Sequence, residues 1–100
     1  MKILLVCASG ISTNILVKKM EEYVKEQGLD VEVVAKGLGE YGEYFNHFDL
    51  ILLGPQISYK RKEIEEHSKK PVLAIPPNDY ALGNVKNIFN QINSISLSTM

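Results

Sequence analysis

Four short apolar runs, separated by segments with helical periodicity, constrain the fold of this chain more than any other feature. The runs occupy residues 3–6, 31–35, 50–53 and 72–75. Continuous runs of this length are typical of strands that are buried on both faces of a parallel sheet. The alternation of strand and helix predicts an α/β fold: a three-layer sandwich in which a four-stranded parallel sheet is covered by helices on both faces.

The first and last helices carry the clearest patterns. The first is expected from Thr13, with Gly28 as its left-handed C-terminal cap, because apolar positions between them recur on one helical face. The last is expected to be capped by Asn78 or Asp79. Its expected apolar face consists of Leu82, Val85, Ile88, Phe89 and Ile92.

The remaining segments have weaker signals. We expect a loop with a short helix over residues 37–48, a turn at residues 54–56 and a charged helix over residues 60–70 that packs weakly. The polar tail at residues 94–100 is expected to fray.

Composition restricts the class of protein. A chain of 100 residues fits a single domain spanning residues 1–100. The formal net charge of −1 argues against nucleic acid as a partner, and no apolar run is long enough for direct membrane insertion. The single cysteine allows no internal disulfide, so we expect a cytoplasmic protein.

The segment from Cys7 to Thr13 is the strongest candidate for a chemical site. Cys7 ends the first expected strand, and the next residues lead into a helix: Ala8, Ser9, Gly10, Ile11, Ser12 and Thr13. Backbone N–H groups in such a loop converge on a small volume, and the helix N-terminus adds positive potential. This arrangement suits a phosphoryl group and favours a cysteine thiolate. The alternative is a buried, inert cysteine before an ordinary helix.

Residues beyond the third and fourth strands are expected to lie near this loop, because the carboxyl ends of parallel strands share one edge. Gln56 is placed to hydrogen-bond either the loop or a phosphoryl group, and Tyr59 follows it closely. A solvated turn is the alternative for both. Asp79 is the only acid directly after the fourth strand, where helix capping is the favoured role over general-acid chemistry.

Three other patterns carry little weight. Residues 37–42 match G-x-G-x-x-G, but no substantial helix or correctly spaced acid follows, so a loop is favoured over a nucleotide site. His47 and His67 lack further ligands at metal-binding spacing, so we expect neither a metal nor another cofactor. Aromatic side chains at helical spacing favour core packing over a partner surface. They are Tyr41, Tyr44, Phe45 and Phe48.

Two motifs together resemble the IIB component of the sugar phosphotransferase system of the lactose/cellobiose type. They are C-A-S-G-I-S-T-N-I-L-V at residues 7–17 and L-L-G-P-Q-I-S-Y at residues 52–59. The resemblance extends over nearly the whole chain in length and element order. Ser12 favours this branch, since related fructose and mannitol components carry glycine there. Ile11 departs from the methionine that is frequent in the family, a change of similar volume.

The resemblance implies a two-step relay. A phosphohistidine on a IIA protein donates a phosphoryl group to Cys7, and the loop from Ala8 to Thr13 holds it. Cys7 then passes the group to a sugar carried by a membrane IIC transporter. The implied sugar is a β-linked disaccharide such as cellobiose, chitobiose or lactose.

A cysteine-dependent phosphatase of the low-molecular-weight tyrosine phosphatase type is the alternative function. Its fold and phosphate loop are similar, but its chemistry requires an arginine six residues after the cysteine, where this chain has Thr13. The only arginine is Arg61. The sequence therefore favours a phosphoryl carrier over a hydrolase.

Overall fold

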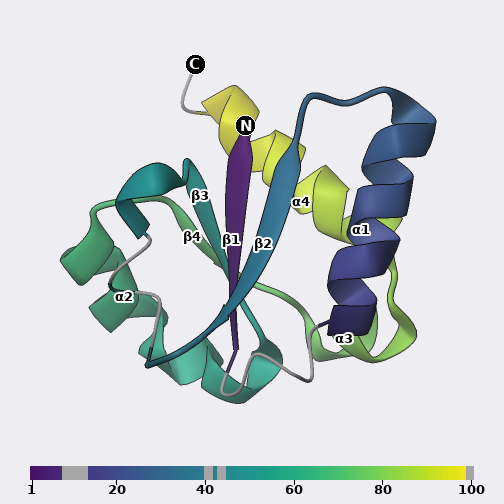
Figure 1. The fold of residues 1–100 in the computed structure, drawn as a ribbon. Helices are drawn as coiled ribbons and strands as arrows, with labels where there is room; N and C mark the ends of the chain where they lie inside the picture. Colours follow the sequence, from purple (N-terminus) through teal and green to yellow (C-terminus); the bar gives the residue numbers. More distant parts are fainter. Residues whose placement is uncertain (8–13, 40–41, 43–44, 99–100) are drawn as a thin grey trace.

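A four-stranded parallel sheet forms the centre of the molecule, as the alternating pattern predicts. The computed structural model describes residues 1–7, 14–39, 42 and 45–98. The strands are β1 (Lys2–Cys7), β2 (Glu32–Gly37), β3 (Leu50–Leu53) and β4 (Val72–Ala74). Their order across the sheet is β2-β1-β3-β4, and each neighbouring pair is parallel (Figure 1). The order changes direction between β1 and β3, which makes their carboxyl ends the expected ligand edge.

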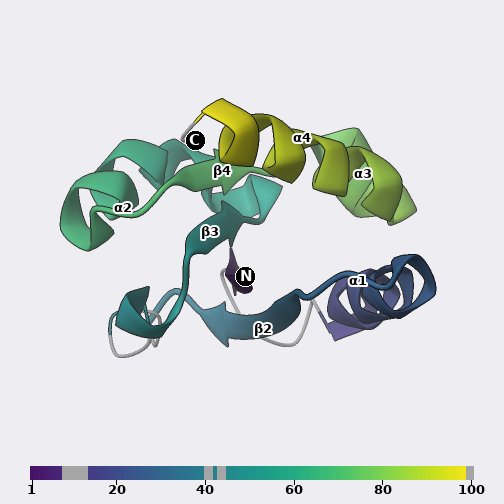
Figure 2. The same cartoon turned by 90° about the horizontal axis from the view of Figure 1, so that it is seen from above.

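Helices cover both faces of this sheet. The helices are α1 (Asn14–Gln27), α2 (Arg61–Ser68), α3 (Pro77–Leu82) and α4 (Val85–Ser98), with short 3-10 turns η2 (Phe45–His47) and η3 (Pro55–Lys60). Seen from above, α2 lies on one side of the sheet and α1, α3 and α4 lie on the other (Figure 2). The three-layer α/β sandwich expected from the sequence is therefore confirmed.

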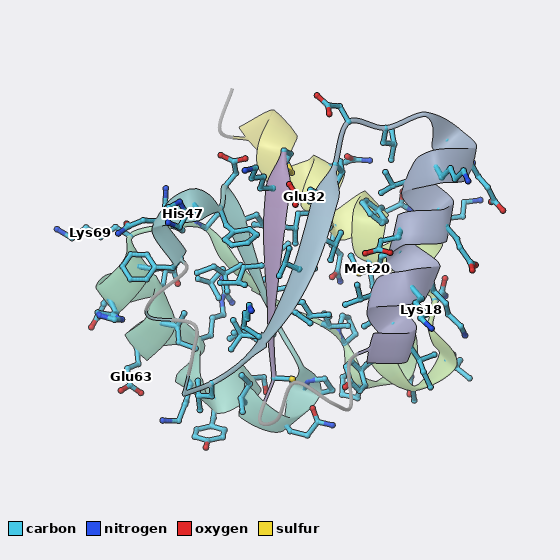
Figure 3. All side chains as sticks on the ribbon, viewed as in Figure 1. Lys18, Met20, Glu32, His47, Glu63 and Lys69 are labelled. Carbon is cyan, nitrogen blue, oxygen red and sulfur yellow. The ribbon has the colours of Figure 1, made fainter. Side chains whose placement is uncertain are left out.

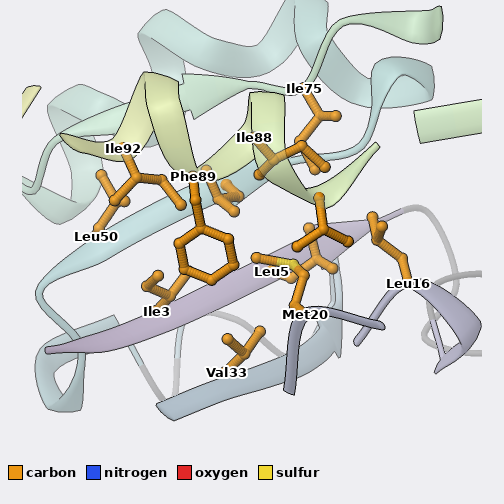
Figure 4. Packing of buried hydrophobic residues seen from close by; sticks show 12 residues of the cluster. Ile3, Leu5, Leu16, Met20, Val33, Leu50, Ile75, Ile88, Phe89 and Ile92 are labelled. Carbon is orange, nitrogen blue, oxygen red and sulfur yellow. The ribbon is translucent and has the colours of Figure 1, made fainter. Parts of the chain in front are cut away.

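The face under α1 and α4 holds the larger part of the core. Side chains at alternate positions of β1 and β3 meet apolar side chains of both helices, as the period of two for a strand requires (Figure 4). Met20 of α1 and Ile88 of α4 are almost completely buried, and the ring of Phe89 stacks on Tyr23 with centroids 5.0 Å apart. This layer anchors α1 to the sheet through Leu16 and Met20.

The opposite face is covered more thinly. Leu4 and Val6 of β1 pack with Ile51 and Leu53 of β3, and α2 contributes Ile64 as its buried apolar side chain. The Nε of Arg61 also donates to the carbonyl of Val72 at 3.2 Å. The charged helix expected over residues 60–70 is thus present in shortened form, with one apolar contact holding it to the sheet.

The last expected helix is in fact two helices, and this corrects three predictions. Gly83 has φ of 63° and ends α3, and α4 begins at Val85. The break turns Leu82 away from the expected apolar face, so that it is 75% exposed. Neither Asn78 nor Asp79 is the helix cap, because both lie inside α3, and the cap position is occupied by Pro76.

Smaller differences concern element ends. β2 starts one residue later than expected and continues to Gly37, because its backbone stays paired with β1 up to Cys7. The turn expected at residues 54–56 is the start of η3, which runs directly into α2. Helix α4 continues to Ser98, through most of the tail expected at residues 94–100. The cap predicted at Gly28 is confirmed by its φ of 65°.

Candidate active site

Cys7 is the last residue of the central strand β1, at the carboxyl edge of the sheet. Its side chain is buried, and Sγ lies 4.0 Å from the carbonyl oxygen of Lys36. Its carbonyl accepts a hydrogen bond from the N–H of Leu38 at 2.8 Å. The cysteine is therefore held by the backbone of β2 on one side, at the point where the strand order changes direction.

Glycines flank Cys7 on both neighbouring strands. Gly37 is its register partner on β2. On the other side, Gly54 follows the last residue of β3, and its N–H donates to the carbonyl of Val6 at 2.9 Å. Because glycine has no Cβ, the backbone of each neighbour can approach the cysteine closely. The sequence placed both glycines at this edge, but only the register shows that they bracket the sulfur-bearing residue.

Gly54 is the meeting point of three side chains. A Cβ on Gly54 would lie 3.0 Å from Oε1 of Gln56, 3.7 Å from Cβ of Cys7 and 3.8 Å from Cε2 of Tyr80. The structure thus brings the side chains of Gln56 and Cys7 to the same glycine, as their placement at the strand ends predicted. Since φ of Gly54 is −62°, the backbone conformation does not require glycine, and an added Cβ would be tight only against the end of the Gln56 side chain.

Tyr80 is the site neighbour that sequence reasoning missed. It comes from α3, and its ring packs against the large core cluster as well as near Gly54. Its distance from Cys7 in the sequence hides this proximity. The available signal was its position four residues after Pro76, one helical turn beyond the end of the fourth apolar run.

Tyr59 lies differently from Gln56. It belongs to η3, is 77% exposed, and has Nζ of Lys60 at 5.9 Å from its ring centroid. A shallow hollow beside it is lined by Ser58, Arg61, Lys62 and Glu65. Its surroundings are therefore those of the solvent-facing start of α2. The predicted loop from Ala8 to Thr13 lies outside the described residues.

The other candidates lie elsewhere. His47 and His67 precede β3 and β4, so they lie toward the opposite edge from Cys7, and His67 faces the ring of Phe45 at a centroid distance of 5.3 Å. Phe45 and Phe48 pack into the smaller core cluster, as expected, whereas Tyr41 and Tyr44 lie outside the described residues. Within the described part of the chain, no group of three or more metal-ligating side chains comes together.

Asp79 makes contacts that link α3 to the residues that follow it. Its Oδ1 accepts a hydrogen bond from Nδ2 of Asn87 at 3.3 Å, and its carbonyl accepts one from the N–H of Asn84 at 2.9 Å. Both bonds join α3 to the start of α4. Asp79 therefore stabilises the junction between these helices in place of the capping role that the sequence suggested.

The fold and the site define a class: a small parallel α/β domain with a cysteine at the carboxyl end of its central strand. The sequence profile of the family described as "PTS system, Lactose/Cellobiose specific IIB subunit" matches residues 2–91. The chain belongs to this family of phosphotransferase system components. Among the described helices, none is both long and apolar enough to cross a membrane.

Curated relatives support the same assignment. The chain is 32% identical to the oligo-beta-mannoside-specific EIIB component of Bacillus subtilis over 97% of each chain. It is 37% identical to the galactose-specific EIIB component of Lactococcus lactis, over 77% of this chain and 73% of the relative. A match at 26% identity covers 68% of this chain and 12% of the lactose-specific EIICB component of Lactococcus lactis.

Solved structures agree with the fold. A cellobiose-specific phosphotransferase IIB component from Borrelia burgdorferi superposes with a TM-score of 0.74 at 33% identity, covering 90% of this chain and 85% of the other. The lactose-specific IIB domain from Streptococcus pneumoniae superposes with a TM-score of 0.80, covering 90% and 95% of the two chains. At 17% identity the second likeness concerns the fold alone.

Proposed function

We propose that this IIB component carries a phosphoryl group on Cys7, received from a phosphohistidine of a IIA protein and passed to a sugar carried by a membrane IIC transporter. The observation that carries the proposal is the position of Cys7. It ends the central strand at the reversal of strand order, between two glycines, in a chain of the IIB family.

The first step exchanges a P–N bond for an S–P bond. The Cys7 thiolate attacks phosphorus, the histidine leaves, and the proton released from the thiol balances the charge on the imidazole. Thiolates are strong nucleophiles, so the protein's main tasks are to position the sulfur and to hold the phosphoryl oxygens. The backbone of β1, which is fixed within the sheet, positions the sulfur.

Residues Ala8 to Thr13 are proposed to hold the phosphoryl oxygens, because their sequence is that of an anion-binding loop before a helix. Gln56 is proposed to add a side-chain donor through Nε2, because its carboxamide lies beside Gly54, next to Cys7. Tyr59 is proposed only to form part of the surface around the Cys7 site, consistent with its exposure to solvent.

The second step returns Cys7 to the thiolate. A sugar hydroxyl attacks phosphorus, loses its proton and forms an O–P bond as the S–P bond breaks. A β-linked disaccharide such as cellobiose, chitobiose or lactose is proposed as the acceptor, in keeping with the oligo-beta-mannoside and cellobiose specificities named for relatives. The EIICB relative, whose name joins B and C components, supports a IIC partner, and this pairing favours work at the cytoplasmic face.

The burial of Cys7 adds a condition to this scheme. The side chain is 0% exposed, so the atoms that cover the sulfur must move before a donor phosphorus can reach it. We propose that binding of a partner near the carboxyl edge of the sheet causes this movement, because the partner replaces solvent at the surface that covers the sulfur. Burial also protects the thiol between transfers.

The test is reconstitution with phosphorylated IIA protein and mapping of the label. We expect the wild-type chain to be labelled at Cys7, and Cys7→Ser to fold normally and take no label. Circular dichroism and the melting temperature control for folding. A labelled Cys7→Ser chain would disprove the assignment, because the acceptor would then be another residue.

The same preparation separates a carrier from a phosphatase. A hydrolase stabilises transition-state charge with a clamp, and a single such donor is worth roughly 10²–10³ in rate. With Thr13 at the position of the phosphatase arginine, we expect slow loss of label in water and rapid discharge by IIC with its sugar. Rapid turnover of p-nitrophenyl phosphate by the isolated chain would favour the phosphatase instead.

A further inference from the structure

Strand β2 forms one edge of the sheet, and the main chain on its outer side is unpaired among the described residues. The strand order leaves β2 with β1 as its single neighbour. The N–H of Glu32 donates to the carbonyl of Met1, so the even-numbered residues of β2 point their main-chain groups at β1. Val33 and Ala35 therefore point theirs outward, where the described part of the chain offers them no hydrogen-bond partner.

The two edges of the sheet differ in how well they are blocked. The other edge strand, β4, is three residues long, and Pro71 and Pro76 lie on either side of it. Short length and proline are two ways in which proteins protect an edge from a further strand. β2 has six residues and no proline, and in Figure 2 no described helix or strand lies beyond it. It is therefore the edge that can accept another strand.

The charges of β2 indicate which strand that is. Glu32 and Lys36 lie on the same face of β2, with Val34 between them. When two β2 strands pair antiparallel about Val34, Glu32 of each chain lies opposite Lys36 of the other. Opposite charges directly across a strand pair stabilise it, whereas like charges destabilise it. A parallel pair in the same register would place each charge against its like, so the pattern favours the antiparallel pair.

The same register also satisfies the main chain. Val33 falls opposite Ala35 of the second copy, and because both point their main-chain groups outward, they exchange N–H···O=C hydrogen bonds. Val34 meets Val34 of the second copy at a non-hydrogen-bonded position, where the side chains approach closely. Val34 is only partly buried against the smaller core cluster, and a β-branched pair is favourable there. One register thus pairs the backbone, the charges and the central side chain.

We infer that the outer edge of β2 pairs antiparallel with the same edge of a second copy of this chain, which joins two sheets into one across a twofold axis. The carboxyl ends of the two sheets then point in opposite directions, so the two Cys7 sites lie at opposite ends of the dimer. The inference goes beyond the proposed function and does not depend on phosphoryl transfer. Since the pairing uses one strand from each chain, we expect a weak dimer that forms at about 0.1–1 mM chain.

The experiment measures self-association by analytical ultracentrifugation from roughly 10 µM to 1 mM chain at low salt. We expect the wild-type chain to dimerise as its concentration rises, and less so in about 1 M salt. Lys36→Glu and Glu32→Lys each turn both opposite-charge pairs into like-charge pairs, so each should raise the dissociation constant about tenfold or more. Lys86→Glu is the control, because Lys86 is exposed on α4, on the other side of the sheet from β2 (Figure 2).

Mixing separates charge pairing from a folding defect. An equimolar mixture of the Lys36→Glu and Glu32→Lys chains should dimerise more strongly than either variant alone, because the charges that face each other are again opposite. The double variant Glu32→Lys/Lys36→Glu should likewise regain the wild-type dissociation constant. Circular dichroism checks that each chain is folded.

Amide hydrogen exchange locates the contact. The N–H groups of Val33 and Ala35 should exchange slowly only at high chain concentration, since the second copy bonds them. The N–H of Val34 points at β1 and should exchange slowly at both concentrations.

Three outcomes would overturn the inference, and none of them affects the role proposed for Cys7. A wild-type chain that stays monomeric at 1 mM and low salt does not pair through β2. A dimer whose dissociation constant is unchanged in both Lys36→Glu and Glu32→Lys uses another surface. Protection of Val33 and Ala35 that arises only when IIA protein is added would assign the edge to that partner and not to a second copy.

Discussion

The two ends of the sheet are built from the same strands but serve different purposes. At the amino end, main-chain groups are tied together: the Met1 amino group donates to the carbonyl of Asp30, and the N–H of Lys2 donates to Oδ2 of Asp49. At the carboxyl end, Cys7 is flanked by glycines, and a groove lies between α1 and α3. The amino end is thus held by hydrogen bonds, whereas the carboxyl end has little side-chain bulk beside Cys7.

Charge does not separate the two ends, because each carries both signs. Figure 3 labels Glu32 and Lys69 toward the amino end, and Lys18 and Glu63 toward the carboxyl end. The comparison predicts that substitutions at the two ends separate activity from stability.

The largest effect is expected from adding one methyl group beside Cys7. Gly54→Ala should lower the rate of phosphoryl transfer about tenfold, because its Cβ would lie 3.0 Å from Oε1 of Gln56 and displace that carboxamide from beside Cys7, and small displacements near a reacting atom are strongly felt. Stability should change little, since φ of −62° suits alanine. Transfer kinetics and the melting temperature are the measurements.

Gly39→Ala is the control for this prediction, because a Cβ there has no atom within 4 Å. It should transfer at the wild-type rate. If Gly54→Ala were equally active, the space beside Cys7 would have no part in transfer and the contrast between the two ends would be weakened.

A smaller effect, on stability alone, is expected at the amino end. Asp49→Ala removes the acceptor of the 2.8 Å bond from Lys2 and should lower the free energy of unfolding by about 1 kcal/mol. For a domain of this size that corresponds to a fall in melting temperature of roughly 4–8 °C. Transfer at Cys7, measured below the transition, should be unchanged.

Asp30→Ala provides the comparison, since the Met1 amino group is bonded to the main-chain carbonyl of Asp30 and not to its carboxylate. It should leave the melting temperature nearly unaltered. A loss of transfer activity in Asp49→Ala at a temperature where it is folded would mean that the two ends are coupled, contrary to the division proposed here.

The smallest effect is expected from a surface ion pair near the carboxyl end. Nζ of Lys60 lies 3.7 Å from Oε2 of Glu63, whose side chain is 72% exposed. Glu63→Gln should therefore change the free energy of unfolding by less than about 0.5 kcal/mol. A larger loss in a denaturant titration would show that stability at this end depends on charge pairing more than on the glycine-lined sheet edge.

Much of the fold could be predicted from the sequence because the strands are short and continuously apolar. Leu50–Leu53 was placed without error, since strong turn signals flank it and both of its faces are buried. The cysteine was also identifiable, because a parallel sheet puts the end of its first strand at the ligand edge. Gly28 was identifiable as a cap because glycine alone adopts φ of 65° without strain.

The division between α3 and α4 could not be predicted in the same way. Apolar residues from Leu82 to Ile92 fit one helical face, and periodicity cannot show that the backbone reverses at Gly83 before Val85. The capping role predicted for Asp79 was wrong for the same reason. Its hydrogen-bond partners Asn84 and Asn87 come close to it only because the chain breaks between α3 and α4.

By itself, the sequence determined the alternation of elements, the sheet type and the cysteine on which the chemistry is proposed to depend, because all of these follow from local patterns. Only the tertiary structure decided that Gly37 and Gly54 bracket Cys7, that Tyr80 lies near Gly54, and that Leu82 is exposed at the end of α3. These depend on strand register and helix packing, which bring together residues far apart in the chain and which no local pattern encodes.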